Sequence, residues 1–413
     1  MECNVMTTGL RGIHPLAKLP LENKTVFLRV DFNVPLDEKG QILDDTRIQQ
    51  SLPTIKYIMK KGRRVILASH LGHPLPNEMG KIVDADRQRF SLESCGLRLA
   101  ELLQCDVHMP EDCIGKGAKK AILDLRAGQL CLLENLRFHA EEKANRGSFA
   151  RALASFAEVY VNDAFGTLHR THASVCALPK LFRDRGCGFL VEKEILALER
   201  LKSIPPRPYV AILGGAKIAD KLGVLYALLD KVDSLIIGGA MANTLLAAQG
   251  YSLQASLVET DKLALARSIL KKAEKQQIAI HLPLDVITAT STHATEVETV
   301  PIQNIPPYRM ALDIGSETRK HYAKVIEHAK TIFWNGPMGL FEKPIFAAGT
   351  LALANKIATL DASIFIGGGD TVAAIQQGGP LTFQGNCHLS TGGGAALELI
   401  EGKELPGLEA LRS

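Results

Sequence analysis

The chain has 413 residues, and its 48 basic and 44 acidic side chains leave a formal net charge of only +4. A charge this small excludes a general nucleic-acid coat, and 46% apolar residues exclude disorder of the whole chain. The sequence contains neither an apolar run of about 18 residues, which a membrane helix needs, nor a secretory signal. Eight scattered cysteines without a Cys-x-x-Cys pair predict reduced thiols in a cytoplasmic protein and give no sign of a zinc site.

Short β-branched runs alternate with stretches of helical spacing along the whole chain. The strands predicted in the first half cover residues 26–30, 65–69, 131–134 and 159–161, and the helices cover 45–61 and 97–103. The strands predicted in the second half cover 209–213, 234–237, 279–282, 331–334 and 363–366, and the helices cover 221–230 and 261–276. Because strands that alternate with helices build parallel sheets, we predict an α/β fold with two doubly wound, Rossmann-like parallel-sheet domains.

A hinge helix is predicted between the two domains. Val191, Ile195 and Leu198 recur at helical spacing, and three prolines in residues 204–208 stop the helix because proline cannot continue its hydrogen-bond ladder. We therefore expect a first domain over 1–190, a hinge helix and linker over 191–208, and a second domain over 209–393.

Polar side chains follow each of the four predicted strands of the first half. They are Asp31, Asn33, His70, His73, Arg137 and Arg170, with Arg47 one loop beyond the first strand. Ligands of parallel α/β sheets bind beyond the carboxyl ends of the strands, so these side chains are expected to converge. Guanidinium groups offer paired donors at fixed geometry, which favours a phosphate or carboxylate ligand here.

Glycine-rich turns follow the strands of the second half and favour a nucleotide ligand. They lie at residues 214–215, 238–239, 315, 336, 367–369 and 392–394. Small residues let backbone amides approach a phosphate, and the start of a helix attracts anions. Lys217 and Lys221 lie one helical turn apart beside the first of these turns, Asp370 suits Mg²⁺, and Glu342 can accept hydrogen bonds from ribose hydroxyls. The chain has no Walker A loop and no G-x-G-x-x-G fingerprint.

In its motifs the chain closely resembles phosphoglycerate kinases along nearly its whole length. The resemblance is carried, in the order found in that family, by VFLRVDFNVPLD, DDTRI, SHLGHP, LLENLRF, NDAFGTLHR, GGAKIADK, GGAMANT, FWNGPMGLFE, GGGDT and STGGGAALE. It implies that the first domain binds 3-phosphoglycerate and that the second binds ATP or ADP with Mg²⁺. It also implies that the tail from about residue 394 to 413 packs back on the first domain.

The resemblance further assigns residues to roles. For the substrate it implies Asp31, Asn33, Arg47, His70, Leu71, Gly72, His73, Arg137 and Arg170. For the nucleotide it implies Gly215, Lys217, Lys221, Gly239, Gly315, Asn335, Glu342, Gly368, Gly369, Asp370 and Thr371, with Asp370 also placing the metal. For catalysis it implies Arg47, Lys217, Gly392 and Gly393.

His73 departs from the family pattern, which has arginine at this position. Histidine has an ordinary pKa of about 6.5 and fewer donors than a permanently charged guanidinium. We therefore expect weaker or more pH-dependent binding of the substrate, and we expect His73→Arg to change it.

The implied reaction is the reversible transfer of a phosphoryl group between 1,3-bisphosphoglycerate and MgADP, a step of glycolysis and gluconeogenesis. A carboxylate acceptor is already ionised at neutral pH, so the reaction needs alignment and charge neutralisation rather than a general base. Arg47 and Lys217 lie in different domains, so we expect the domains to close by bending near residues 191–208. The resemblance also leads us to expect a monomer that binds neither nucleic acid nor membrane.

Two other functions are compatible with the motifs. One is a nucleotide- or phosphate-binding protein of the same fold whose catalysis is impaired, with His73 as the lesion. The other is a dinucleotide-dependent dehydrogenase, which the missing G-x-G-x-x-G fingerprint disfavours.

Overall fold

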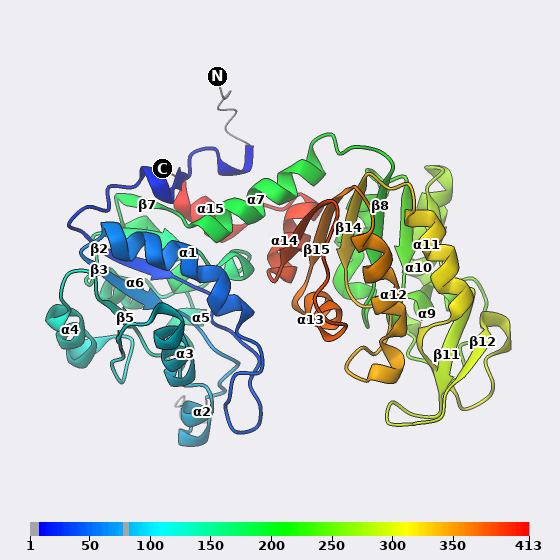
Figure 1. The fold of residues 1–413 in the computed structure, drawn as a ribbon, viewed down its shortest axis with the longest axis horizontal. Helices are drawn as coiled ribbons and strands as arrows, with labels where there is room; N and C mark the ends of the chain where they lie inside the picture. The colour runs from blue at the N-terminus through cyan, green and yellow to red at the C-terminus, as the bar shows by residue number, and fades with distance from the viewer. Residues whose placement is uncertain (1–7, 77–81, 413) are drawn as a thin grey trace. The chain divides into compact units, whose positions relative to one another are not determined.

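The computed structural model describes residues 8–76 and 82–412 (Figure 1). The chain forms two compact units, residues 1–196 with 404–413 and residues 197–403. Each unit is built around a parallel sheet, which confirms the predicted α/β fold. None of the helices in the described ranges is both long enough and apolar enough to cross a bilayer.

The sheet of the first unit has seven strands in the order β1-β7-β6-β2-β3-β5-β4, all of them parallel. Its strands are β1 (His14–Pro15), β2 (Thr25–Arg29), β3 (Arg64–Ala68), β4 (Val107–His108), β5 (Leu130–Leu132), β6 (Val159–Asn162) and β7 (Asp184–Cys187). Strands β2, β3, β5 and β6 are those predicted from the sequence. Their central position explains the uninterrupted apolar runs, because both faces of these strands are covered.

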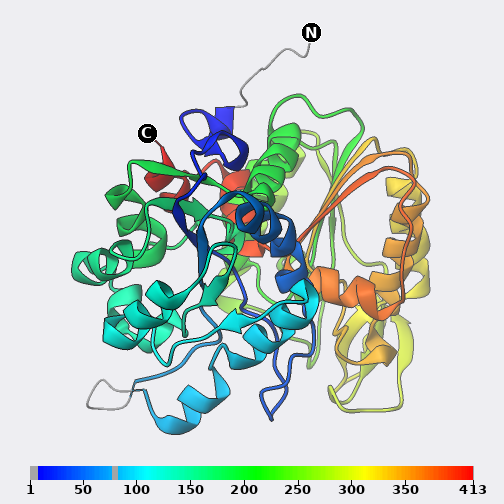
Figure 2. The same cartoon turned by 60° about the vertical axis from the view of Figure 1, so that its left-hand side comes forward.

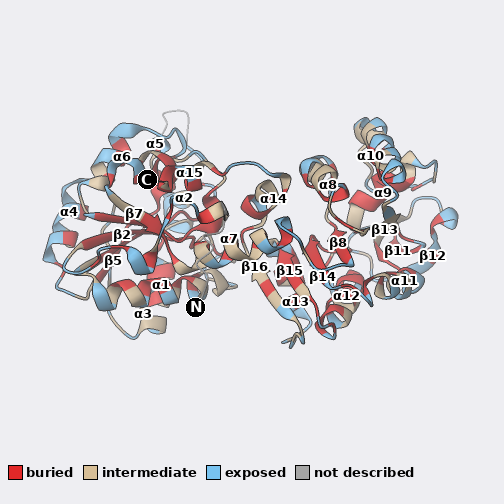
Figure 3. Ribbon diagram, turned by 90° about the horizontal axis from the view of Figure 1, so that it is seen from above, coloured by how far each residue is buried: buried red, intermediate tan, exposed pale blue. Residues whose placement is uncertain are grey.

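Helices cover both faces of this sheet. They are α1 (Thr46–Lys61), α2 (Asp84–Arg89), α3 (Glu93–Leu103), α4 (Gly115–Asp124), α5 (Ala140–Lys143), α6 (Gly147–Ala154) and α15 (Pro406–Leu411). Helices α1 and α3 lie on one face, and α5, α6 and α15 lie on the other (Figure 3). Short helical turns follow the strand ends, among them η3 (Leu136–Phe138), η4 (Phe165–Thr167) and the π-helix η5 (Ala173–Ala177). These turns carry several of the polar side chains discussed below.

The C-terminal tail returns to the first unit, as Figure 2 shows for the red end of the chain beside the green segment. Helix α15 packs on η5, and the Gly407 amide donates to the Leu168 carbonyl over 2.9 Å. The return begins at Glu404 and not near residue 394 as expected. The reason is helix α14 (Gly393–Glu401), which packs on α8 (Leu222–Leu229) and so belongs to the second unit.

Helix α7 (Phe189–Lys202) corresponds to the predicted hinge helix. The apolar stripe predicted from the sequence is buried, since Val191, Ile195 and Leu198 are each at most 1% exposed. The division between the units falls inside this helix, after Leu196. The predicted bounds of the first domain (1–190), the hinge (191–208) and the second domain (209–393) therefore stay a prediction.

The sheet of the second unit has six parallel strands in the order β10-β9-β8-β14-β15-β16. Its strands are β8 (Tyr209–Leu213), β9 (Ser234–Ile237), β10 (Ala279–His281), β14 (Thr331–Asn335), β15 (Ser363–Gly367) and β16 (Asn386–Ser390). Helices α8, α9 (Gly239–Ala248), α10 (Leu263–Lys275) and α14 lie on one face (Figure 3). Helices α11 (Ser316–Ile326), α12 (Ala348–Ala358) and α13 (Gly369–Gln377) lie on the other.

A separate three-stranded antiparallel sheet was not predicted from the sequence. It consists of β11 (Asp285–Ala289) between β12 (Glu298–Pro301) and β13 (Met310–Ile314). The β-branched run at residues 286–290 is the signal for β11, whereas β12 is short and mostly exposed and so carries no clear alternation. This sheet supplies one wall of the cavity described next.

Candidate active site

A cluster of arginine and histidine side chains gathers at the carboxyl ends of the strands in the first unit. This basic cluster is made of Arg29, Arg47, His70, His73, Arg137 and Arg170. The first of these ends β2, and the others come from the start of α1, the loop after β3, the turn η3 after β5 and the loop after η4. Because parallel strands all end at the same edge of a sheet, residues far apart in sequence meet there.

Hydrogen bonds tie the cluster to the predicted substrate residues. Arg47 Nη1 lies 2.5 Å from Asp31 Oδ2, and Arg170 Nη1 lies 3.3 Å from His70 Nε2. Arg137 Nη1 donates to the Gly72 carbonyl over 2.5 Å and lies 2.9 Å from His73 Nδ1. The Asn33 side-chain oxygen accepts from the Gly72 amide over 2.8 Å, and Leu71, which precedes Gly72, is fully buried. The predicted residues of the first unit are therefore brought together.

Three buried residues were not predicted from the sequence: Arg29 of the basic cluster, and Ser174 and Glu142 beside it. Arg29, 1% exposed, donates from Nε to Ser174 Oγ over 2.9 Å, and its Nη2 lies 3.2 Å from His70 Nδ1. Ser174 donates from its amide and its hydroxyl to the fully buried carboxylate of Glu142, over 2.8 and 2.5 Å. The signal for Arg29 was present, because it is the one charged residue inside the apolar run of the first strand.

The electrostatics of the cluster favour an anion. Four arginines share the site with two carboxylates, Asp31 and Glu142. Burial, followed by the charges of Arg29 and Arg137, holds the pKa of His70 well below its ordinary value. Burial and then Arg170 lower the pKa of Arg137 to about 10. Like charges held together in a partly desolvated place gain most from a multiply charged anion.

One arginine nitrogen of the cluster lacks a hydrogen-bond partner in the described part of the chain. Nε of Arg137 is buried and has no hydrogen-bond partner among the described residues. An unsatisfied guanidinium N–H is costly inside a protein, so a ligand oxygen that accepts from it binds with a clear advantage.

The environment of His73 bears on its departure from the family pattern. Burial first, then the charges of Arg137, Arg170 and Lys143, lower its pKa from the ordinary value. His73 is therefore neutral at neutral pH, and it meets Arg137 as an acceptor instead of adding a charge. The expected pH dependence of substrate binding stays a prediction, and this lowered pKa moves it to the acid side of about pH 6.5.

The second unit contains a cavity of about 430 Å³. Four predicted nucleotide residues line it: Gly215, Gly239, Glu342 and Asp370. Most of the rest of its lining is apolar, including Leu257, Val286, Met310, Leu312 and Met338. A mainly apolar hollow with a few polar groups at its rim suits a planar heterocycle joined to a charged tail.

Lys221 joins two loops beside this cavity. Its Nζ donates to the Gly214 carbonyl over 2.6 Å and to the Asn335 carbonyl over 3.0 Å. Thr371 Oγ1 accepts from the Gly336 amide over 2.7 Å. Gly336 has φ +100°, and a Cβ there would lie 2.3 Å from the Gly214 carbonyl oxygen, so only glycine fits. The strand ends after β8, β14 and β15 are thus held as one unit.

Two helices begin side by side at this edge of the sheet. Asp370 lies in the first turn of α13, which Gly369 opens, and Gly393 opens α14. A Cβ on Gly393 would lie 3.1 Å from the Cα of Gly368, and the Gly368 amide donates to the Ser390 carbonyl over 3.1 Å. Unpaired amides at two helix starts attract phosphate oxygens.

Seven predicted nucleotide residues lie outside the cavity lining: Lys217, Lys221, Gly315, Asn335, Gly368, Gly369 and Thr371. Lys217 is exposed in the segment that follows β8. Gly315 is buried, and a Cβ there would lie 2.2 Å from Cγ of Asp285. Close packing of the chain around Asp285 is therefore the visible role of Gly315, while its neighbours Asp313 and Ile314 do line the cavity.

Comparisons with known proteins show the family of the chain. The family model for phosphoglycerate kinase matches residues 16–403. Phosphoglycerate kinase of Anaeromyxobacter dehalogenans (strain 2CP-1) is 49% identical over 400 residues, which cover 97% of this chain and 99% of that protein.

Solved structures point to the same family. The structure of phosphoglycerate kinase from Coxiella burnetii matches with a TM-score of 0.81 at 37% identity, and that from Pyrococcus horikoshii with 0.85 at 33%. Each match covers 97% of this chain and 98% of the other. The family model spans most of the chain and a relative over nearly its whole length is 49% identical, so the chain belongs to the phosphoglycerate kinase family.

Proposed function

We propose that this chain catalyses the reversible transfer of a phosphoryl group between 1,3-bisphosphoglycerate and MgADP, which gives 3-phosphoglycerate and ATP. Membership of the family supports this reaction. The single structural observation that carries it is the basic cluster, in which four arginines meet around Asp31 and His70 at the strand ends of the first unit. A site of this charge suits a small substrate that carries both a phosphate and a carboxylate.

In this proposal the basic cluster holds 3-phosphoglycerate. Arg137, with its free Nε, and Arg170 bind anionic oxygens together with His70 and His73, while Asp31 and Asn33 receive the hydroxyl and carboxylate region. Arg47 is held by Asp31 and brings its positive charge to the group in transfer. Buried Arg29 and Glu142 position His70 and Ser174 rather than contact the substrate.

The cavity of the second unit binds the nucleotide in this proposal. Its apolar walls, among them Leu257 and Val286, receive the base, and Glu342 accepts from the ribose. Amides near Gly215, Gly239 and Gly368 lie at turns that approach phosphates closely. Lys221, Asn335 and Thr371 fix those turns through the hydrogen bonds described above.

Mg²⁺ is the metal that the proposal assigns to the nucleotide. Asp370 offers one exposed carboxylate in the first turn of α13, beside glycines that leave room for phosphates. A single carboxylate fits Mg²⁺, because this ion takes most of its oxygen ligands from water and phosphate. Bound there, the ion neutralises charge on the phosphates.

The transfer step itself falls to residues of both units. Arg47, the exposed Lys217 and the amides of Gly392 and Gly393 neutralise the flat phosphoryl group as it moves, and no general base is needed because the acceptor carboxylate is ionised. We propose that the units approach each other by bending at α7 and residues 203–208 to align these groups and exclude water. We also propose that the protein acts as a cytoplasmic monomer.

A coupled spectrophotometric assay tests the function. Purified protein with MgATP should turn over 3-phosphoglycerate at a rate typical of kinases, about 1–100 per second, and should be inactive with glycerol phosphate or pyruvate. Folded protein that binds both ligands yet shows no turnover would establish instead the impaired binding protein considered from the sequence.

A further inference from the structure

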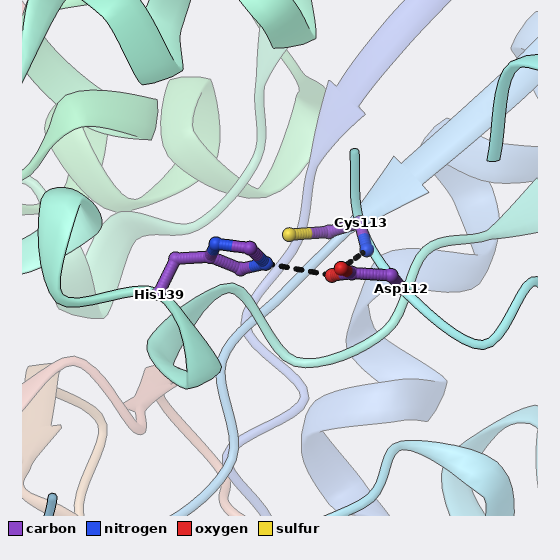
Figure 4. Close-up of side chains that lie close together, drawn as sticks. All are labelled: Asp112, Cys113 and His139. Atoms are coloured by element: carbon purple, nitrogen blue, oxygen red, sulfur yellow. Dashed lines mark hydrogen bonds and ion pairs between the residues drawn. The ribbon is translucent and has the colours of Figure 1, made fainter. Parts of the chain in front are cut away.

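Outside the two sites, three potential metal ligands from two segments of the first unit lie close together (Figure 4). Asp112 and Cys113 lie in the loop between β4 and α4, and His139 lies between η3 and α5. One ligand atom from each residue lies within 4.8 Å of the other two. Asp112 Oδ1 accepts from the Cys113 amide over 2.7 Å and lies 2.6 Å from His139 Nε2.

The geometry points to a zinc site formed by Cys113 Sγ, His139 Nε2 and an Asp112 carboxylate oxygen. Zinc commonly takes thiolate, imidazole and carboxylate ligands, with Zn–S of about 2.3 Å and Zn–N of about 2.0 Å, which places ligand atoms about 3–4 Å apart. The observed upper limit of 4.8 Å between the ligand atoms is close to this spacing. Three protein ligands leave a fourth position for water.

Charge and chemistry favour Zn²⁺ over the Mg²⁺ that serves the nucleotide. One thiolate and one carboxylate neutralise the two positive charges of the ion, and sulfur with imidazole nitrogen selects zinc over hard cations. On binding, the thiol S–H bond breaks, its proton passes to the buffer, and the sulfur lone pair forms the Zn–S bond. The imidazole binds through Nε2 and keeps its proton on Nδ1.

The surroundings are consistent with a held but accessible ion. Cys113 is fully buried, whereas the side chains of His139 and Asp112 are 20% and 44% exposed, so an ion can enter from solvent. The His139 ring stacks on Phe149 with centroids 5.2 Å apart, which fixes its plane. Glu142 adds a nearby negative charge, and Arg87, an exposed residue whose guanidinium lies over Phe138, adds a positive one.

Covalent chemistry at this cysteine is disfavoured. Burial first, and then the carboxylates of Asp112 and Glu142, raise the pKa of the Cys113 thiol well above its ordinary value. Without a metal the sulfur therefore stays protonated and is a poor nucleophile.

No pattern in the sequence predicts this site, because its two segments lie 26 residues apart without a ligand-spacing motif. The site also shares a segment with the basic cluster, since His139 follows Arg137 by two residues. A zinc ion would therefore tie the loop before α4 to the segment that carries Arg137.

Cobalt titration of the full chain tests the proposal. Protein treated with chelator and kept reduced should bind one Co²⁺ with a thiolate-to-cobalt charge-transfer band in the near ultraviolet, and one Zn²⁺ should abolish the band. Cys113→Ser should remove the band, and His139→Gln should weaken zinc binding by at least about tenfold. The matched variants Cys105→Ser and His108→Gln, from the same unit but outside the cluster, should behave as the wild type.

Two outcomes would overturn the zinc site. One is a wild type without the charge-transfer band, and the other is a band that persists unchanged in folded Cys113→Ser. If that variant fails to fold, His139→Gln decides, because its partly exposed side chain can be replaced without disturbing the core; undiminished zinc affinity in it would contradict the assignment.

Discussion

Replacing Arg137 by methionine separates binding from folding at the basic cluster. Methionine keeps the unbranched apolar stem but removes the guanidinium, which meets Gly72 and His73 through Nη1 and holds a free, buried Nε. The variant therefore loses its charge and all of its donors to an anion. It also removes a like charge close to Arg29 and Arg170.

The lost hydrogen bonds lower the stability of the variant, whereas the removal of a like charge raises it. Each lost hydrogen bond costs about 1 kcal/mol, and relief of charge repulsion offsets part of that cost, so the free energy of unfolding should change by less than about 2 kcal/mol. Binding has no such compensation. Charge-assisted hydrogen bonds to an anion are worth about 1.5–3 kcal/mol each, so losing about 3 kcal/mol raises KM for 3-phosphoglycerate about 100-fold.

The assay is steady-state turnover against 3-phosphoglycerate concentration, with thermal unfolding measured on the same samples. Arg64→Met is the matched control, because Arg64 also donates to two backbone carbonyls, those of Leu123 and Leu125, at the start of β3. The control should lose some stability and keep its KM. A folded Arg137→Met enzyme with KM within about threefold of the wild type would show that Arg137 does not bind the substrate. A threefold change corresponds to about 0.7 kcal/mol, which is less than one charged hydrogen bond contributes.

Further predictions concern the nucleotide side and acid stability. Lys217→Ala should lower kcat about 100- to 1,000-fold in the coupled assay while MgADP affinity, measured by calorimetry, changes little. Gly336→Ala should lose about 2–4 kcal/mol of unfolding free energy in urea, because its φ is +100° and its Cβ would meet the Gly214 carbonyl; an unchanged midpoint would contradict the packing. Burial, and then the charges of Arg137 and Arg29, lower the pKa of His172 to about 3. The unfolded chain therefore binds more protons than the folded one between about pH 6.5 and pH 3, and stability falls as the pH falls. His172→Asn should reduce this fall, measured as the change of Tm with pH.

The sequence predicted those parts of the fold that follow from local periodicity. All nine strands predicted from apolar runs are present. Eight of them lie inside a parallel sheet, where strands are buried on both faces and carry uninterrupted apolar runs, whereas β10 lies at an edge. Other edge strands were not predicted. Strand β1 has two residues and β12 is mostly exposed, so neither carries a pattern that distinguishes it from a loop.

For the candidate site, the residues that follow predicted strands were found from the sequence, but the buried residues that hold them in place were not. Asp31, His70 and Arg137 follow predicted strands directly, and parallel topology brings them together. Glu142 and Ser174 lie on short helical turns, and their role depends on a buried contact between segments 32 residues apart, which no local pattern encodes. The tail boundary was misplaced for a similar reason, because only the packing of α14 on α8 assigns residues 393–401 to the second unit.

In the proposed function, the basic cluster holds the acid substrate and the cavity of the second unit holds the nucleotide. Calorimetric titration of wild type, Arg137→Met and Lys221→Met with 3-phosphoglycerate and, separately, with MgADP tests it directly. We expect that Arg137→Met loses affinity for 3-phosphoglycerate alone and Lys221→Met for MgADP alone, each by about tenfold or more. Wild-type affinity for 3-phosphoglycerate in Arg137→Met, or loss of both affinities in either folded variant, would contradict it.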